Sequence, residues 1–134
     1  MDKKIFFVLI TIGLFFSNTL KAETVLYCQS ELATGFINED GVWKEGPFSR
    51  KRFTVKFNDD FSLLEGVSFH PMECSIQYNF KPNTISCVHS RGTYRTFMYN
   101  KIKKRFLYSE ISIAGYVNNN TDTEVLYAGT CQNF

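Results

Sequence analysis

The chain has 134 residues, with 15 lysine and arginine residues against 13 aspartate and glutamate residues and a formal net charge of +2. The first 22 residues hold three of the lysines and one of the acids, so the rest of the chain has 12 residues of each sign. A net charge near zero gives no support to nucleic-acid binding, and we expect no nucleic-acid partner.

Residues 1–22 have the order of a secretory signal peptide. Lys3 and Lys4 form a positive start, residues 5–16 are an uncharged apolar run, and a polar segment leads to Ala22. The apolar run is short of the roughly 20 residues that a membrane-spanning helix needs. The sequence therefore predicts a signal peptide, 1–22, and a single periplasmic or secreted domain, 23–134, with no stable membrane span once the leader is removed. A retained anchor helix is the alternative.

After the leader, short runs of β-branched and aromatic residues alternate with turn residues, which is typical of strands. In chain order, the predicted β segments are residues 24–28, 36–37, 42–43, 53–57, 61–64, 67–69, 74–80, 85–89, 93–99, 106–116, 124–128 and 130–134. The longest, 106–116, contains Gly115 as a bend or bulge. This spacing predicts an all-β fold, a small antiparallel β-barrel or β-sandwich of about eight strands.

Four cysteines follow the leader: Cys28, Cys74, Cys87 and Cys131. An even number in a short exported chain predicts two disulfides, which can pair in three ways. Cys74 and Cys87 flank a predicted hairpin turn, and opposed hairpin positions lie within disulfide range. This favours Cys74–Cys87, which leaves Cys28–Cys131 to join the first strand to the last. The two pairings that link the hairpin to the chain ends stay open.

The two histidines, His70 and His89, are the first candidates for chemistry. His89 shares a strand face with Cys87, but a structural zinc site needs four ligands and close cysteine spacing. The sequence also has no Gly-x-Ser-x-Gly motif, cysteine-protease signature or glycine-rich phosphate loop. We therefore predict no metal, no cofactor, no catalytic residue and no enzymatic activity.

Two basic clusters, residues 50–52 and 103–105, each precede an aromatic residue that starts a strand. Such clusters bind anionic headgroups, polysaccharide or an acidic protein face. The alternative is a solvated loop or a lysine-protected edge strand. Binding is favoured if both clusters lie on one rim of the barrel. Phe36 and Trp43 are expected to be partly exposed aromatics. The candidate binding residues are Arg50, Lys51, Arg52, Trp43, Lys101, Lys103, Lys104 and Arg105.

The sequence also contains several short motifs: Tyr27-Cys28, Ala33-Thr34-Gly35-Phe36, Trp43 and Gly129-Thr130-Cys131. They resemble those of small exported bacterial proteins of uncharacterised function. This resemblance implies export and supplies no catalytic residue. The early Tyr-Cys strand is also similar to that of the membrane-bound or periplasmic inhibitors of C-type lysozyme, which are small disulfide-bonded β-barrels. Their inhibitory loop reads Ser-Gly-x-x-Tyr, whereas residues 90–94 read Ser-Arg-Gly-Thr-Tyr, so no inhibitory residue is carried over.

The favoured hypothesis is an exported, non-catalytic binding module that recognises a protein or a cell-envelope component, with an envelope or secreted protein as the expected partner. The alternatives are a small ligand carrier or hydrolase that uses the barrel mouth, and a lysozyme-inhibitor-like protein. A deep pocket with His70 or His89 beside a carboxylate would indicate the carrier or hydrolase, and an interior filled by side chains would argue against it.

Overall fold

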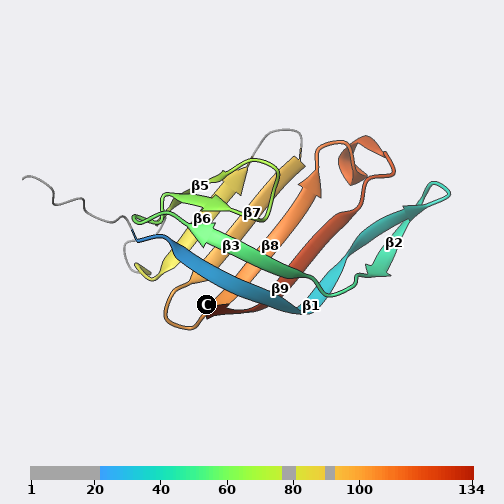
Figure 1. Ribbon diagram of the computed structural model, residues 1–134. Helices are drawn as coiled ribbons and strands as arrows, with labels where there is room; N and C mark the ends of the chain where they lie inside the picture. Colours follow the sequence, from blue (N-terminus) through green and yellow to red (C-terminus); the bar gives the residue numbers. More distant parts are fainter. Residues whose placement is uncertain (1–21, 77–80, 90–92) are drawn as a thin grey trace, which may run out of the picture.

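The computed structural model describes residues 22–76, 81–89 and 93–134, so nearly all of the predicted signal peptide lies outside it. The described residues form nine strands and one short 3₁₀-helix (Figure 1). In chain order these are β1 (Thr24–Glu39), β2 (Val42–Pro47), β3 (Arg52–Phe57), β4 (Leu63–Glu65), β5 (Met72–Ser75), β6 (Thr84–His89), β7 (Thr93–Asn100), β8 (Arg105–Ser112), η1 (Tyr116–Asn118) and β9 (Glu124–Asn133).

All pairings in the sheet are antiparallel. The strand order is β2-β1-β3-β4-β5-β6-β7-β8-β9, and β9 also pairs with β1. This last pairing closes an eight-stranded barrel, outside which β2 lies as one extra strand. The predicted all-β class is therefore confirmed, and of the two predicted architectures the barrel is the one formed.

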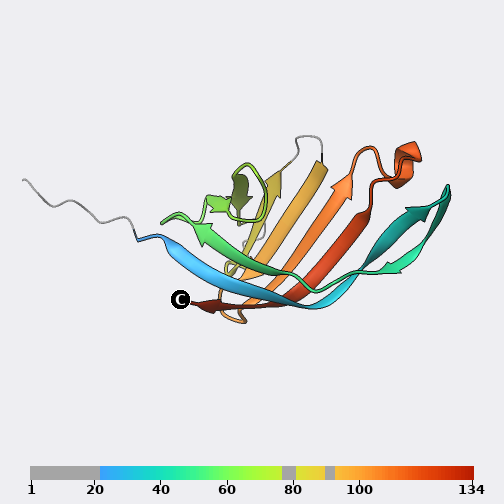
Figure 2. The same cartoon turned by 45° about the vertical axis from the view of Figure 1, so that its right-hand side comes forward.

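Strand β1 is the longest element, with 16 residues, and it belongs both to the barrel and to an extension beyond the barrel. Its first half pairs with β3, whereas its second half pairs with β2 beyond the barrel wall. We call residues 34–47, the second half of β1 with its turn and β2, the arm; Figure 2 shows it reaching past the barrel beside η1. A register shift between Ser30 and Leu32 lets one strand follow both directions, because a bulge bends a strand and increases its twist.

Several predicted boundaries were wrong. The segments 24–28 and 36–37 belong to one strand. The polar residues between them continue the strand, because one of its faces is partly exposed to solvent. The segment 106–116 ends at Ser112, after which the chain turns into η1. Residues 67–69 form bends rather than a strand. The segments 124–128 and 130–134 join in β9, where Gly129 fits because a Cβ there would lie 2.0 Å from the Gln29 carbonyl oxygen.

The barrel interior is built in layers that follow the register of β6 to β9. The three rows are Ile85–Tyr99–Phe106–Gly129, then Cys87–Phe97–Tyr108–Tyr127, then His89–Arg95–Glu110–Val125. The side chains of the first two rows are almost completely buried. Aromatic rings therefore fill the middle of the barrel, and the third row puts a charged pair at one end. We call this end, where β8 finishes and β9 begins, the mouth.

Both disulfides have the favoured pairing. Cys28 of β1 is the register partner of Cys131 of β9, and Cys74 of β5 is the register partner of Cys87 of β6. The first bond joins the two strands that close the barrel, and the second staples the short β5 to the sheet.

Candidate functional site

An apolar groove lies on the outer face of the sheet, between the arm and the loop that joins β8 to β9. Its volume is about 870 Å³. Besides the buried Val125, the apolar side chains that line it come from β1, β2, β8, η1 and β9: Phe36, Trp43, Ile111, Tyr116, Val117 and Leu126. We call this the aromatic groove. Strand alternation explains its floor, because residues that alternate with the buried Tyr108 and Tyr127 must face outward.

The two walls of the groove touch through Trp43 and Tyr116. Their rings meet edge to face, with centroids 5.3 Å apart. The indole Nε1–H of Trp43 also donates a hydrogen bond to Asn119 Oδ1, at 3.2 Å. An aromatic pair of this geometry is worth about 0.5–1.5 kcal/mol beyond the burial of its area. The arm is therefore tied to the loop that carries η1.

The carboxylate of Glu124 holds that loop in place. Its Oε2 accepts the backbone N–H of Ser112 at 2.8 Å, and its Oε1 accepts the N–H of Tyr116 at 3.3 Å. A Cβ at Gly115 would lie 2.0 Å from Glu124 Oε1, so the glycine allows this close approach. Glu124 is only 9% exposed, and charge-assisted hydrogen bonds offset the cost of burying it.

The groove remains open to solvent despite its apolar lining. Phe36 is 52% exposed, Tyr116 62% and Val117 85%. The two wall segments, residues 34–47 and 113–124, contain five carboxylates and a single lysine, a net charge of −4. The lysine, Lys44, is itself paired with Glu39. The site is thus a hydrophobic groove in an acidic setting.

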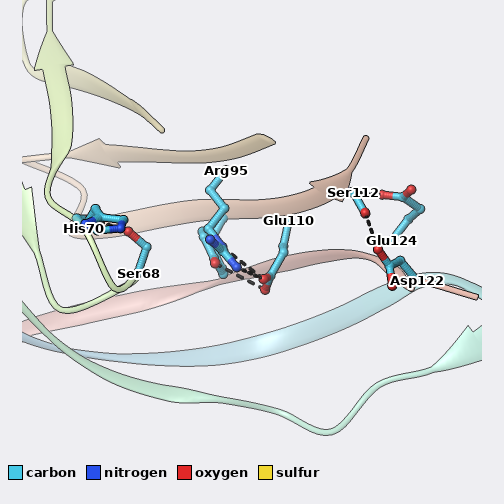
Figure 3. Close-up of polar contacts among 8 residues, drawn as sticks. Ser68, His70, Arg95, Glu110, Ser112, Asp122 and Glu124 are labelled. Carbon is cyan, nitrogen blue, oxygen red and sulfur yellow. Dashed lines mark hydrogen bonds and ion pairs between the residues drawn. The ribbon is translucent and has the colours of Figure 1, made fainter. Parts of the chain in front are cut away.

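A second polar site lies at the barrel mouth, where Figure 3 shows Arg95 and Glu110 facing each other. The guanidinium of Arg95 donates from Nη2 and Nε to Glu110 Oε1, at 2.6 and 3.0 Å. Burial lowers the pKa of Arg95, but the Glu110 carboxylate more than compensates and leaves the pKa raised. Burial, aided by Glu110, raises the pKa of Tyr108 well above the ordinary range. Arg95 and Glu110 therefore form an ion pair in which each charge is neutralised by the other.

Other mouth residues extend this polar layer. Ser112 Oγ donates to Asp122 Oδ2 at 2.6 Å, and the Lys51 ammonium lies 5.1 Å from the centroid of the Tyr127 ring. His70 and His89 stack with centroids 5.7 Å apart, and neither ring nitrogen of His89 has a hydrogen-bond partner among the described residues. In the part of the chain that the structure describes, no group of three histidine, cysteine, aspartate or glutamate side chains is placed to hold a metal ion.

The two basic clusters, residues 50–52 and 103–105, lie mostly apart from each other in the structure. Arg52, Gln29, Thr130 and Arg105 are successive register partners across four strands, so Arg52 and Arg105 share one row on the outer face. The strands β3 and β8 run in opposite directions, so the remaining cluster residues diverge from this row toward opposite ends of the barrel.

Several of these basic residues are engaged within the chain. Lys51 faces Tyr127, the Lys101 ammonium lies 5.0 Å from the Phe61 ring, and Lys104 Nζ contacts Asn133 Oδ1 at 3.4 Å. Arg50 and Lys103 are exposed. The two clusters therefore do not lie on one rim, which was the condition that favoured binding, and the basic surface that they share consists of Arg52 and Arg105.

Sequence reasoning identified Trp43 and Phe36 as partly exposed aromatics, and both line the groove. It missed Ile111, Tyr116 and Leu126, which were assigned to predicted strands, and Val117, which follows the predicted segment 106–116. The neighbours of these residues in space are distant in the chain. It also missed Glu124, whose position directly after a loop of asparagines was the one available signal of a loop anchor.

Among residues 22–76, 81–89 and 93–134 there is no helix with the length and apolar character needed to cross a membrane. No family model, curated protein or solved structure matches the chain. Fold and site therefore define the class on their own: a disulfide-bonded, eight-stranded antiparallel β-barrel with an arm and an aromatic groove on its outer face.

Proposed function

We propose that this chain is an exported, non-catalytic binding module that recognises a protein of the cell envelope or exterior through the aromatic groove. The observation that carries the proposal is a groove lined by five exposed apolar side chains and the half-buried Trp43, with a wall that is held by the buried Glu124. Contiguous exposed apolar surface is typical of interaction sites, and tryptophan and tyrosine are enriched among the residues that dominate binding energy.

Two further observations support this proposal. Disulfides persist in oxidising compartments, which favours a periplasmic or secreted location. The two aromatic layers fill the middle of the barrel, which favours recognition on the outer surface over a carrier or hydrolase with an internal cavity. Residues 90–94, whose sequence is the nearest to the inhibitory motif of lysozyme inhibitors, include residues 90–92, which lie outside the described residues.

Site-specific photo-crosslinking tests the proposal. A photoreactive amino acid at Val117, on the groove wall, is compared with one at Ile102, another strongly exposed apolar residue, in the turn between β7 and β8. In cells that make the protein, we expect discrete protein adducts from position 117 only. Adding Phe36→Ala should remove them while leaving the unfolding temperature within a few degrees of the parent. The same adducts from position 102, adducts that persist in Phe36→Ala, or none at position 117 would each contradict the proposal.

The row that contains Arg52 and Arg105, which we call the basic row, is the alternative recognition surface, and it is tested in the same way. Replacing Arg52 and Arg105 by glutamine removes both charges of the shared row without touching the groove. We expect the adducts at position 117 to persist in this double variant. Their loss would move the recognition site from the groove to the basic row.

A further inference from the structure

We infer that the aromatic groove receives an extended, cationic peptide segment of the partner, which adds as a strand to the free edge of β2 and places alternate apolar side chains in the groove. This inference rests on the proposed function and specifies how the same site works. It is carried by the backbone geometry of β2, the position of the groove on one face of that strand, and the charge of the walls.

The backbone of β2 offers unpaired groups on its outer edge. The turn Asp40-Gly41, with φ of 53° and 82°, is a two-residue hairpin turn that makes Glu39 and Val42 a hydrogen-bonded pair. Hydrogen-bonded pairs alternate along an antiparallel ladder, so Lys44 also turns its backbone groups toward β1. The N–H and C=O groups of Trp43 and Glu45 then point away from β1. In the described residues β2 pairs with β1 alone, so these four groups have no strand partner.

The free edge and the groove lie next to each other. Trp43 and Glu45 both line the groove, and they are the residues whose backbone groups face outward. A strand paired to this edge would direct every second side chain to the groove face of the sheet, because side chains alternate with a period of two. Main-chain hydrogen bonds would supply affinity, and the groove would select apolar side chains, as in other cases of strand addition.

The charge of the walls selects the kind of segment. Their net charge of −4 attracts a cationic segment and repels anionic lipid headgroups or a phosphorylated peptide. A second copy of this chain is disfavoured for the same reason. Pairing two β2 edges through Trp43 and Glu45 would also set Lys44 directly opposite Lys44 of the other copy, and like charges in that position are destabilising.

A synthetic peptide panel tests the inference on the chain without its leader. The probe is a nine-residue peptide that alternates lysine with valine or phenylalanine. The first control replaces every lysine with glutamate. Two further peptides carry N-methyl groups on the odd or on the even residues, which blocks one edge of the strand at a time. We expect the probe to bind, the acidic peptide to fail, and only one of the two N-methylated isomers to bind.

Hydrogen exchange measured by NMR locates the contact. The amides of Trp43 and Glu45 should become protected on binding, whereas the Lys44 amide, already paired with β1, should change little. Glu45→Ala removes a charge and keeps the N–H, and Glu45→Pro removes both at an edge position that tolerates proline. We expect Glu45→Pro to weaken binding about three- to tenfold beyond Glu45→Ala, the effect of one backbone hydrogen bond.

The outcomes separate this inference from the proposed function. Absence of probe binding, equal binding of both N-methylated isomers, or unprotected Trp43 and Glu45 amides would overturn strand addition, while adducts at Val117 would still support recognition through the groove. Stronger binding of the acidic peptide would overturn the cationic assignment. A dimer in sedimentation that Glu45→Pro dissociates would make a second copy the occupant and would also overturn it.

Discussion

Trp43 on β2 and Tyr116 on η1 meet edge to face with centroids 5.3 Å apart, and their contact joins two segments that are far apart in the chain. Trp43 is the single tryptophan of the protein, so its fluorescence reports directly on this contact. The position of Tyr116 depends in turn on Glu124, which accepts the Tyr116 backbone N–H. The shape of the groove therefore depends on contacts between distant segments of the chain, and the buried carboxylate of Glu124 holds one of them in place.

Glu124→Gln tests that dependence. The amide keeps one acceptor oxygen but loses the charge, so one of the two backbone hydrogen bonds to Ser112 and Tyr116 weakens or breaks. We expect a loss of about 1–2 kcal/mol in the free energy of unfolding, together with a red shift of Trp43 emission as the loop loosens. Glu31→Gln is the matched control, because the exposed Glu31 accepts a single hydrogen bond within the described residues, from the Thr130 hydroxyl. An equal effect of the two variants would show that Glu124 does not hold the groove wall.

Gly35→Ala is expected to damage the arm where β1 crosses β9. A Cβ at position 35 would lie 1.9 Å from the Glu124 carbonyl oxygen, a backbone atom that cannot move without shifting β9. Overpacking of this kind costs about 1–3 kcal/mol or more. At Gly46, the register partner of Gly35, the nearest atoms belong to the Ile37 side chain at 3.0 Å, which can change rotamer. Urea unfolding of both variants should show a clearly smaller loss for Gly46→Ala.

The local chemistry of the sequence was enough to predict the all-β class and to favour the disulfide pairing that the structure has. Cys74 and Cys87 flank a hairpin, so a contact between near neighbours in the chain decided one bond and elimination supplied the other. The continuity of β1 was not predictable from the sequence. The bulge between Ser30 and Leu32 and the change of partner strand are not marked by any characteristic residue pattern. The aromatic groove was out of reach for a related reason: Trp43 and Tyr116 become neighbours only when the barrel closes.

Removing each disulfide should destabilise the protein by an amount that follows its loop length. The Cys28–Cys131 bond closes a separation of 103 residues and the Cys74–Cys87 bond one of 13. On the chain-entropy account, replacing both cysteines by alanine should cost about 4–5 kcal/mol for the long loop and about 3 kcal/mol for the short one. Denaturant unfolding of the two double variants measures both values. A greater loss from the short loop would mean that native packing around β5, rather than the unfolded chain, dominates.

Tyr108 should make stability fall in alkaline solution. Burial in the second aromatic layer raises the pKa of its hydroxyl, and the Glu110 carboxylate adds to the effect. The folded state therefore holds the phenolic proton more tightly than the unfolded chain, whose tyrosines ionise near pH 10. The free energy of unfolding is unaffected by this group below about pH 10 and declines above it, because the unfolded state releases the proton first.

Tyr108→Phe should flatten this decline. Burial also raises the pKa of Tyr99, in the first layer, so Tyr99→Phe should reduce the slope as well. Denaturant unfolding between pH 8 and 11, with tyrosinate absorbance followed in parallel, measures the slope and the ionisation together. At neutral pH, Tyr99→Phe should cost little, because its hydroxyl has no hydrogen-bond partner among the described residues. An unchanged slope in Tyr108→Phe would mean that the phenol ionises within the folded barrel, and the packing of its layer would have to be looser than the register implies.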